Sequence, residues 1–228
     1  MYHFEYVKKV EYIPEKEKII KLLQDVKRDL SKKFTIRFKF VGSVARNMIT
    51  RDKKTNVGYD FDVNIYVDNV DDYKPKYIRM EIRKSIDKFV KKYGYATVED
   101  STSVLTIKVK DKAKSCIKHS CDFAVVDEFE DEDGNWNQWY IKLNKKSNSY
   151  IWQERSNSFY DLQYKIDWLK KNNYWNEVRN QYIENKNKNE NPKVKSRSIF
   201  AYTVAEVFHW YREARKPKVK QDIVLNFW

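Results

Sequence analysis

The sequence predicts a mixed α+β fold, in which a mixed sheet flanked by helices is followed by a helical region. Hydrophobic residues make up 41% of the 228 residues, which is enough to build a core. Extended and helical patterns alternate up to about residue 150, and only helical spacing follows. We therefore expect two domains, residues 1–150 and residues 151–228.

Extended and helical patterns alternate in the first of these parts. Behind Pro14, apolar residues recur at helical spacing and predict a helix that ends near Ser31. A second helical pattern runs from Tyr77 to Tyr93 and is capped at Gly94. The segments that read as strands are 34–41, 59–67, 103–109, 117–126 and 136–143. We expect a short helix over 44–49 and a polar loop over 50–58.

The second part has helical spacing from about residue 156 to Ile183. An Asn- and Lys-rich stretch, 185–195, contains Pro192 and predicts a loop. A last helix is expected over 199–214, and Pro217 ends it before a terminal segment that reaches Trp228.

Charge and cysteine content limit the classes of function. The 46 Lys and Arg exceed the 33 Asp and Glu, and the net charge of +13 favours a nucleic acid or nucleotide partner. The excess of Lys is also typical of a composition bias that makes surfaces basic without a ligand. No apolar run approaches the roughly 20 residues of a membrane span. With two cysteines and no signal-like start, we expect a cytoplasmic protein without a membrane partner.

Two aspartates mark the strand predicted over 59–67. Side chains two positions apart share a strand face, so Asp60 and Asp62 project together while Phe61 and Val63 face the other way. Such a pair is either solvated or neutralised by a divalent cation such as Mg²⁺ or Mn²⁺. Asp122 favours the cation, because it interrupts an apolar strand in which an unpaired carboxylate is costly to bury.

The order of these residues resembles that of the DNA polymerase β-like nucleotidyltransferases. The matching pattern is Phe40-Val41-Gly42-Ser43, then Asp60-Phe61-Asp62-Val63, then Asp122 within a later strand. The helical part is similar to that of the oligoadenylate synthetase and cyclic-dinucleotide synthase branch, the cGAS/DncV-like proteins. There a Lys that ends one helix and a Ser that opens the next hold the triphosphate, and Lys186 and Ser198 match these positions. The segment between Ser43 and Asp60 is longer than is usual in the family.

The resemblance implies a template-independent nucleotidyltransferase, an enzyme of the EC 2.7.7 type. It would transfer NMP from an NTP, expected to be ATP, to a hydroxyl acceptor and release pyrophosphate. Two Mg²⁺ or Mn²⁺ ions would lie between the triphosphate and three catalytic, metal-binding carboxylates, those of Asp60, Asp62 and Asp122. Residues 1–150 would form the palm-like catalytic domain, and residues 151–228 would complete the nucleotide-binding cleft.

The resemblance and the charge pattern also assign binding residues. Those expected to bind the nucleotide are Gly42, Ser43, Lys186, Ser198 and Tyr202. Those expected to bind the acceptor are Arg46, Arg51, Lys53 and Lys54. The basic charge favours a nucleotide or RNA as acceptor. The alternative is a non-catalytic nucleic-acid-binding protein that retains the fold and uses the 46–54 loop and the basic C-terminus, although a pure binder gains nothing from carboxylates that face phosphates.

Overall fold

The helices and strands confirm the mixed α+β class that the sequence predicts. The computed structural model describes residues 3–55, 57–111, 113, 115–134, 136–155 and 160–214. By its contacts the chain divides into two units, with the division between residues 157 and 158. In the part of the chain that is described, the first unit holds all the strands and the second is helical.

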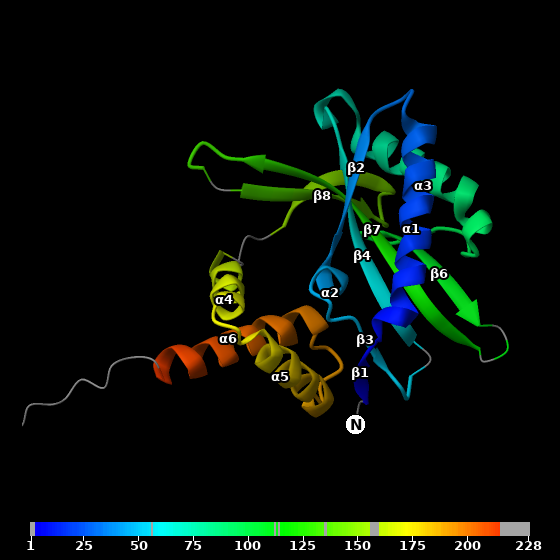
Figure 1. Ribbon diagram of the computed structural model, residues 1–228. Helices are drawn as coiled ribbons and strands as arrows, with labels where there is room; N and C mark the ends of the chain where they lie inside the picture. The colour runs from blue at the N-terminus through cyan, green and yellow to red at the C-terminus, as the bar shows by residue number, and fades with distance from the viewer. Residues whose placement is uncertain are drawn as a thin grey trace, which may run out of the picture. The chain divides into compact units, whose positions relative to one another are not determined.

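The first unit is built on a mixed sheet with the strand order β2-β4-β7-β6-β5 (Figure 1). The strand β8 pairs with the C-terminal part of β7, and β9 pairs with β8. The strands of this sheet are β2 (Ile36–Val41), β4 (Val57–Val67), β5 (Glu99–Asp100), β6 (Leu105–Asp111), β7 (Cys116–Glu130), β8 (Trp136–Asn144) and β9 (Ser149–Glu154). The pair β4 and β7 is parallel, and the other pairs are antiparallel. This parallel pair carries the predicted acids.

Two helices, α1 (Lys9–Leu30) and α3 (Pro75–Phe89), lie side by side and cover one face of this sheet (Figure 1). The apolar core between them and the strands includes Leu22, Ile82, Phe61 and Phe123, all fully buried. Because strand side chains alternate, the residues between these apolar ones point to the opposite face. The short elements of the unit are α2 (Gly42–Ala45), η1 (Val70–Asp72) and η2 (Val90–Tyr93), after which the predicted cap Gly94 has a φ of +81°.

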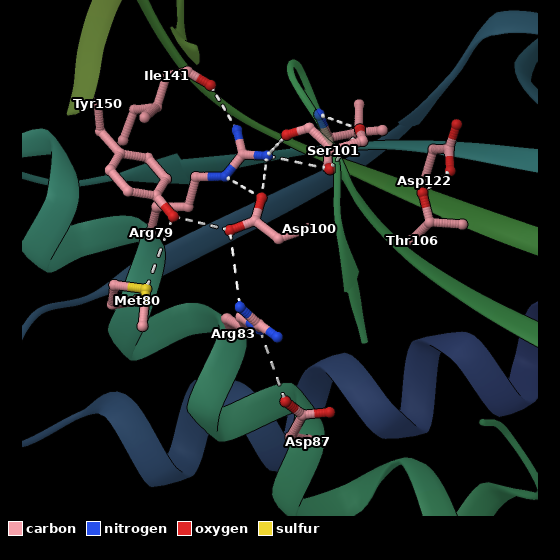
Figure 2. A network of polar contacts seen from close by, with 11 residues as sticks. Arg79, Met80, Arg83, Asp87, Asp100, Ser101, Thr106, Asp122, Ile141 and Tyr150 are labelled. Carbon is pink, nitrogen blue, oxygen red and sulfur yellow. Dashed lines mark hydrogen bonds and ion pairs between the residues drawn. The ribbon is translucent and has the colours of Figure 1, made fainter. Parts of the chain in front are cut away.

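A buried arginine ties α3 to the strands around it (Figure 2). The side chain of Arg79 has no exposed surface and donates to the carboxylate of Asp100 at 2.6 and 3.0 Å. It also donates to the backbone carbonyl oxygens of Ile141, Ser101 and Val104. The hydroxyl of Tyr150 donates to the other oxygen of Asp100 at 3.0 Å. The network therefore joins α3 to β5, β8, β9 and the turn before β6.

Two predictions near the N-terminus are wrong. The first helix begins at Lys9 rather than behind Pro14, because Tyr12 is buried and donates to Asn47 at 3.2 Å, which holds the extra turn in place. The segment 50–58 is not a loop throughout. It contains β3 (Thr50–Asp52), which pairs with β1 (Phe4–Tyr6), and the start of β4. The short helix expected over 44–49 is α2, which ends at Ala45.

The sequence analysis also missed the strand β9. Its partner is β8, and their register places Tyr150 opposite Leu143 and Glu154 opposite Trp139. The expected boundary after residue 150 would therefore cut a strand of the sheet.

The described residues of the second unit form three helices, α4 (Tyr160–Lys171), α5 (Trp175–Lys188) and α6 (Ser196–Ala214). Aromatic contacts join them, such as the stacked rings of Tyr174 and Tyr211 at 3.8 Å between centroids. The helix α5 continues three residues past the expected loop start at 185, and α6 begins three residues earlier than expected. The terminal segment 215–228 lies outside the described residues. No helix in the described ranges is both long and apolar enough to cross a membrane.

Candidate active site

The three aspartates stand on one face of the sheet, the face opposite to α1 and α3. In the parallel register of β4 and β7, Asp62 is the direct partner of Asp122 and Asp60 is the partner of Ser120. Neighbouring strands lie roughly 4.8 Å apart, so the Asp62 and Asp122 side chains project next to each other. The arrangement unites acids that are 60 residues apart in the sequence.

The electrostatic environment differs between the three acids. Asp60 is exposed, whereas Asp62 and Asp122 are half-buried. Burial raises the pKa of Asp62 to about 6, and the negative charges of Asp122 and Asp60 contribute to the rise. The positive charges of Arg46 and Arg155 act in the opposite direction on the pKa of Asp62. Burial also raises the pKa of Asp122. The folded chain therefore holds mutually repelling carboxylates that a cation would neutralise.

Two hydroxyl groups contact two of the three acids, Asp122 and Asp60. Thr106 on β6, the strand partner of Asp122, donates from Oγ1 to Asp122 Oδ1 at 2.6 Å (Figure 2). Ser120 on β7 donates from Oγ to Asp60 Oδ1. The sequence analysis did not find these two residues, because their approach depends on the register of pairing between separate strands.

The predicted Gly42-Ser43 bend lies directly beside the acids. Val41, the last residue of β2, is the strand partner of Asp62, and Gly42 begins α2 with a φ of +65°. A Cβ atom placed on Gly42 would stand 2.3 Å from Asp62 Oδ2. Both the backbone conformation and the close approach require glycine here.

The donor set fits Mg²⁺ or Mn²⁺ that arrives with a nucleotide. Carboxylate oxygens are the hard ligands that these ions prefer, and a cation would offset the negative charges of Asp122 and Asp60 that add to the effect of burial on the pKa of Asp62. Among the described residues no group of three His, Cys, Asp or Glu converges tightly enough to hold an ion alone. Mg²⁺ is typically bound by one or two carboxylates together with substrate phosphates, which agrees with an open set of this kind.

The residues predicted to bind the acceptor separate into two groups. The charge of Arg46 acts on Asp62, so this residue is near the acids. In contrast, Arg51 pairs with Glu5 at 2.9 Å and with Glu11 at 2.6 Å. Lys53 also pairs with Glu5, at 2.6 Å, and Lys54 is exposed. The ion pairs of Arg51 and Lys53 join β1, β3 and α1.

The sequence analysis did not single out Arg155, which follows β9. Its Nη1 donates to Gln138 Oε1 at 2.5 Å, and its guanidinium lies 5.3 Å from the ring centroid of Tyr140. Both partners are on β8, and the positive charge of Arg155 acts on Asp62. Its position depends on β9, the strand that the sequence pattern did not reveal.

The three remaining predicted residues belong to the second unit. Lys186 lies within α5 and is buried, with its ammonium group 5.6 Å from the ring centroid of Tyr182. Ser198 and Tyr202 are exposed on α6, one helical turn apart, and the Tyr202 hydroxyl donates to Glu206 at 3.2 Å. Their roles in nucleotide binding stay predictions.

No protein-family model and no curated protein matches the chain. Solved structures do match. The STING-associated CdnE c-di-GMP synthase from Capnocytophaga granulosa aligns with a TM-score of 0.55 and 14% identity, over 90% of this chain and 64% of that one. The Vibrio cholerae DncV cyclic AMP-GMP synthase, described as a prokaryotic cGAS homolog, aligns with a TM-score of 0.54 and 16% identity, over 84% of this chain and 52% of that one.

A further structure of Vibrio cholerae DncV, in complex with the linear intermediate 5′ pppA(3′,5′)pG, aligns with a TM-score of 0.52 and 17% identity, over 79% of this chain and 47% of that one. The chain thus spans less than two thirds of the length of each of these structures. These similarities confirm, at the level of the fold, the resemblance that the Gly-Ser and aspartate pattern predicts. The chain therefore has the fold of these cyclic-dinucleotide synthases.

Proposed function

We propose that the chain is an NTP-dependent nucleotidyltransferase that moves NMP from an NTP to a hydroxyl acceptor and releases pyrophosphate. One observation carries this proposal. The strand register gathers Asp60, Asp62 and Asp122 on one sheet face, with Gly42 in contact distance of Asp62. A contribution to stability does not explain why these acids are gathered on one face, because the raised pKa of Asp62 means that its charge is unfavourable in the folded chain.

The residues of the chain have separate roles in this reaction. Asp60, Asp62 and Asp122 would hold divalent cations, Mg²⁺ or Mn²⁺, which supply positive charge for activation of the acceptor hydroxyl and for the departing pyrophosphate. The absence of a side chain at Gly42 leaves room for the carboxylate of Asp62, and the backbone N–H groups and Ser43 hydroxyl of this bend would bind phosphate oxygens. Most of the rate enhancement would come from positioning and charge neutralisation.

Asp122 is the residue that we assign to take the proton of the acceptor hydroxyl. Its Oδ1 accepts the hydrogen bond from Thr106, so Oδ2 is the oxygen that would face the cation and the acceptor hydroxyl that this cation activates.

The acceptor that we propose is the hydroxyl of a second ribonucleotide. The structural neighbours support this choice, because they are a c-di-GMP synthase and a cyclic AMP-GMP synthase, the latter also solved with the intermediate pppA(3′,5′)pG. The net charge of +13 agrees with an anionic acceptor, either a nucleotide or RNA. ATP and GTP are the donors to test first, because DncV was also solved with GTP and with 3′-deoxy ATP.

Incubation with α-labelled NTPs tests the proposal. Each NTP is supplied alone, in pairs, or with RNA, in the presence of Mg²⁺ or Mn²⁺. We expect a labelled nucleotide product and pyrophosphate from the wild type, and neither from Asp62→Asn or Asp122→Asn. The matched control is Asp68→Asn, since Asp68 is a partly exposed aspartate at the end of the same strand and pairs with Arg37 at 3.1 Å.

The same experiment separates the alternative function. A folded wild type that releases no pyrophosphate from any NTP contradicts the proposal. RNA binding that is unchanged in Asp62→Asn, together with the absence of product, would instead indicate the non-catalytic nucleic-acid-binding protein.

A further inference from the structure

The strand register forms two polar rows across the face that carries the acids. One row runs from Asp62 through Asp122 and Thr106 to Glu99 on β5. The row beside it runs from Asp60 through Ser120 to Lys108 on β6. In each row an aspartate and a hydroxyl-bearing residue are therefore neighbours on the same face.

The two hydroxyls each contact one carboxylate oxygen. Thr106 Oγ1 donates to Asp122 Oδ1 at 2.6 Å along its row, and Ser120 Oγ donates to Asp60 Oδ1. A hydroxyl carries a single proton, so each of these hydroxyls uses its one hydrogen-bond donor on the carboxylate. These contacts leave Oδ2 of both carboxylates available to a ligand, since no hydrogen bond to either atom is found among the described residues. In the described residues no hydroxyl donates to Asp62, which lies between the two acids.

The ends of the two rows are occupied by an ion pair. Lys108 Nζ contacts Glu99 Oε2, which joins the last members of the two rows. The ammonium group of Lys108 is thereby held at Glu99, on the far side of the hydroxyls from Asp60 and Asp62. The hydroxyls of Thr106 and Ser120, and not the ammonium group of Lys108, therefore contact the carboxylates of Asp122 and Asp60.

We propose that Thr106 and Ser120 are positioning residues, which fix the carboxylates of Asp122 and Asp60 in the orientation that receives a nucleotide-bound divalent cation. This inference rests on the proposed function of the same site. Three acids on one face repel one another, and without a fixed donor the side chains of Asp60 and Asp122 would turn apart. A hydroxyl on one oxygen limits this rotation before the cation arrives, so less ordering is needed upon binding. Partners of this type typically change metal affinity or activity by about 10- to 100-fold.

The test is a Mn²⁺ titration followed by electron paramagnetic resonance, with a non-hydrolysable ATP analogue present. This readout reports cation binding and does not need turnover. We expect Thr106→Val and Ser120→Ala each to weaken Mn²⁺ binding by about 10-fold or more and to lower kcat/KM in parallel. Thr106→Ser keeps the donor and should bind Mn²⁺ within about threefold of the wild type.

The matched control is Ser85→Ala. Ser85 on α3 donates to Asp29 Oδ2 at 2.8 Å, so this variant also removes a hydroxyl from an aspartate, but on the helical side of the sheet. It should bind Mn²⁺ as the wild type does. Circular dichroism checks that each variant is folded, and Thr106→Ala replaces Thr106→Val if the valine does not fit.

The possible outcomes separate the two proposals. If the wild type binds Mn²⁺ and folded Thr106→Val and Ser120→Ala bind it equally well, the positioning role is wrong and the proposed function stands. If the wild type binds Mn²⁺ but forms no product, while both variants lose binding, the positioning role stands and the proposed transfer reaction is wrong. A wild type that binds no Mn²⁺ with the analogue contradicts both.

Discussion

Replacement of Asp62 by asparagine should make the metal-free protein more stable while it abolishes turnover. The pKa of Asp62 rises from 3.8 to about 6 in the folded chain, because of burial and the charges of Asp122 and Asp60. The ionised form is therefore disfavoured by folding. The asparagine would keep the size of the side chain and remove the charge.

The size and pH dependence of this effect follow from linkage. A shift of about 2 pKa units corresponds to about 3 kcal/mol, and partial contact of the carboxylate with water reduces this to roughly 1–3 kcal/mol. Between pH 4 and pH 6 the folded state binds more protons at Asp62 than the unfolded state does, so this group lowers the free energy of unfolding as the pH rises. The cost is complete above pH 6 and absent well below pH 4.

Urea-induced unfolding in EDTA, at pH 4 and at pH 8, measures this difference. Asp62→Asn should exceed the wild type by roughly 1–3 kcal/mol at pH 8 and by a smaller amount at pH 4. Asp68→Asn should instead lose less than about 1 kcal/mol, because it removes a partly exposed ion pair with Arg37. A variant at Asp62 that is no more stable than the wild type at pH 8 would refute the reasoning that burial and the neighbouring acids make the charge of Asp62 unfavourable in the folded chain.

Two further predictions concern Arg79 and Gly42. Arg79→Met should lower the free energy of unfolding by about 3–5 kcal/mol in urea titrations, because it leaves the carboxylate of Asp100 without its buried partner; a loss below about 1 kcal/mol would contradict this. Gly42→Ala should reduce kcat/KM at least tenfold, since its Cβ would displace the carboxylate of Asp62. Gly94→Ala is its matched control, because Gly94 also has a positive φ but no atom within 4 Å of the added Cβ, so stability should fall by about 1–2 kcal/mol and turnover should remain. Equal turnover in the two glycine variants would count against the placement of the bend.

The acids of the site could be predicted from local patterns, whereas their supporting residues could not. The alternation around Asp60 and Asp62 fixes which side chains share a face, and this needs only the two-residue period of a strand. That β4 and β7 are adjacent and parallel is a property of the whole sheet, so the opposition of Asp62 to Asp122 could only be suspected from the family pattern. The contacts of Thr106 and Ser120 require the register itself.

The parts of the fold that the sequence did not reveal are short strands with weak local signals. The strands β1 and β3 have three residues each. The ion pair of Arg51 with Glu5 supports their pairing, and that of Arg51 with Glu11 joins β3 to α1. The strand β9 is identified only by its pairing with β8. Arg155 follows β9 directly, so its effect on Asp62 could not be predicted without this strand.

Crystals grown with Mn²⁺ and a non-hydrolysable ATP or GTP analogue would test the central claim most directly. The anomalous signal of manganese locates the ion without any assumption about turnover. We expect a peak that contacts the carboxylate of Asp62 and that of Asp60 or Asp122, with the triphosphate beside Gly42. A nucleotide bound elsewhere on the chain, with no manganese at Asp62, would contradict the account.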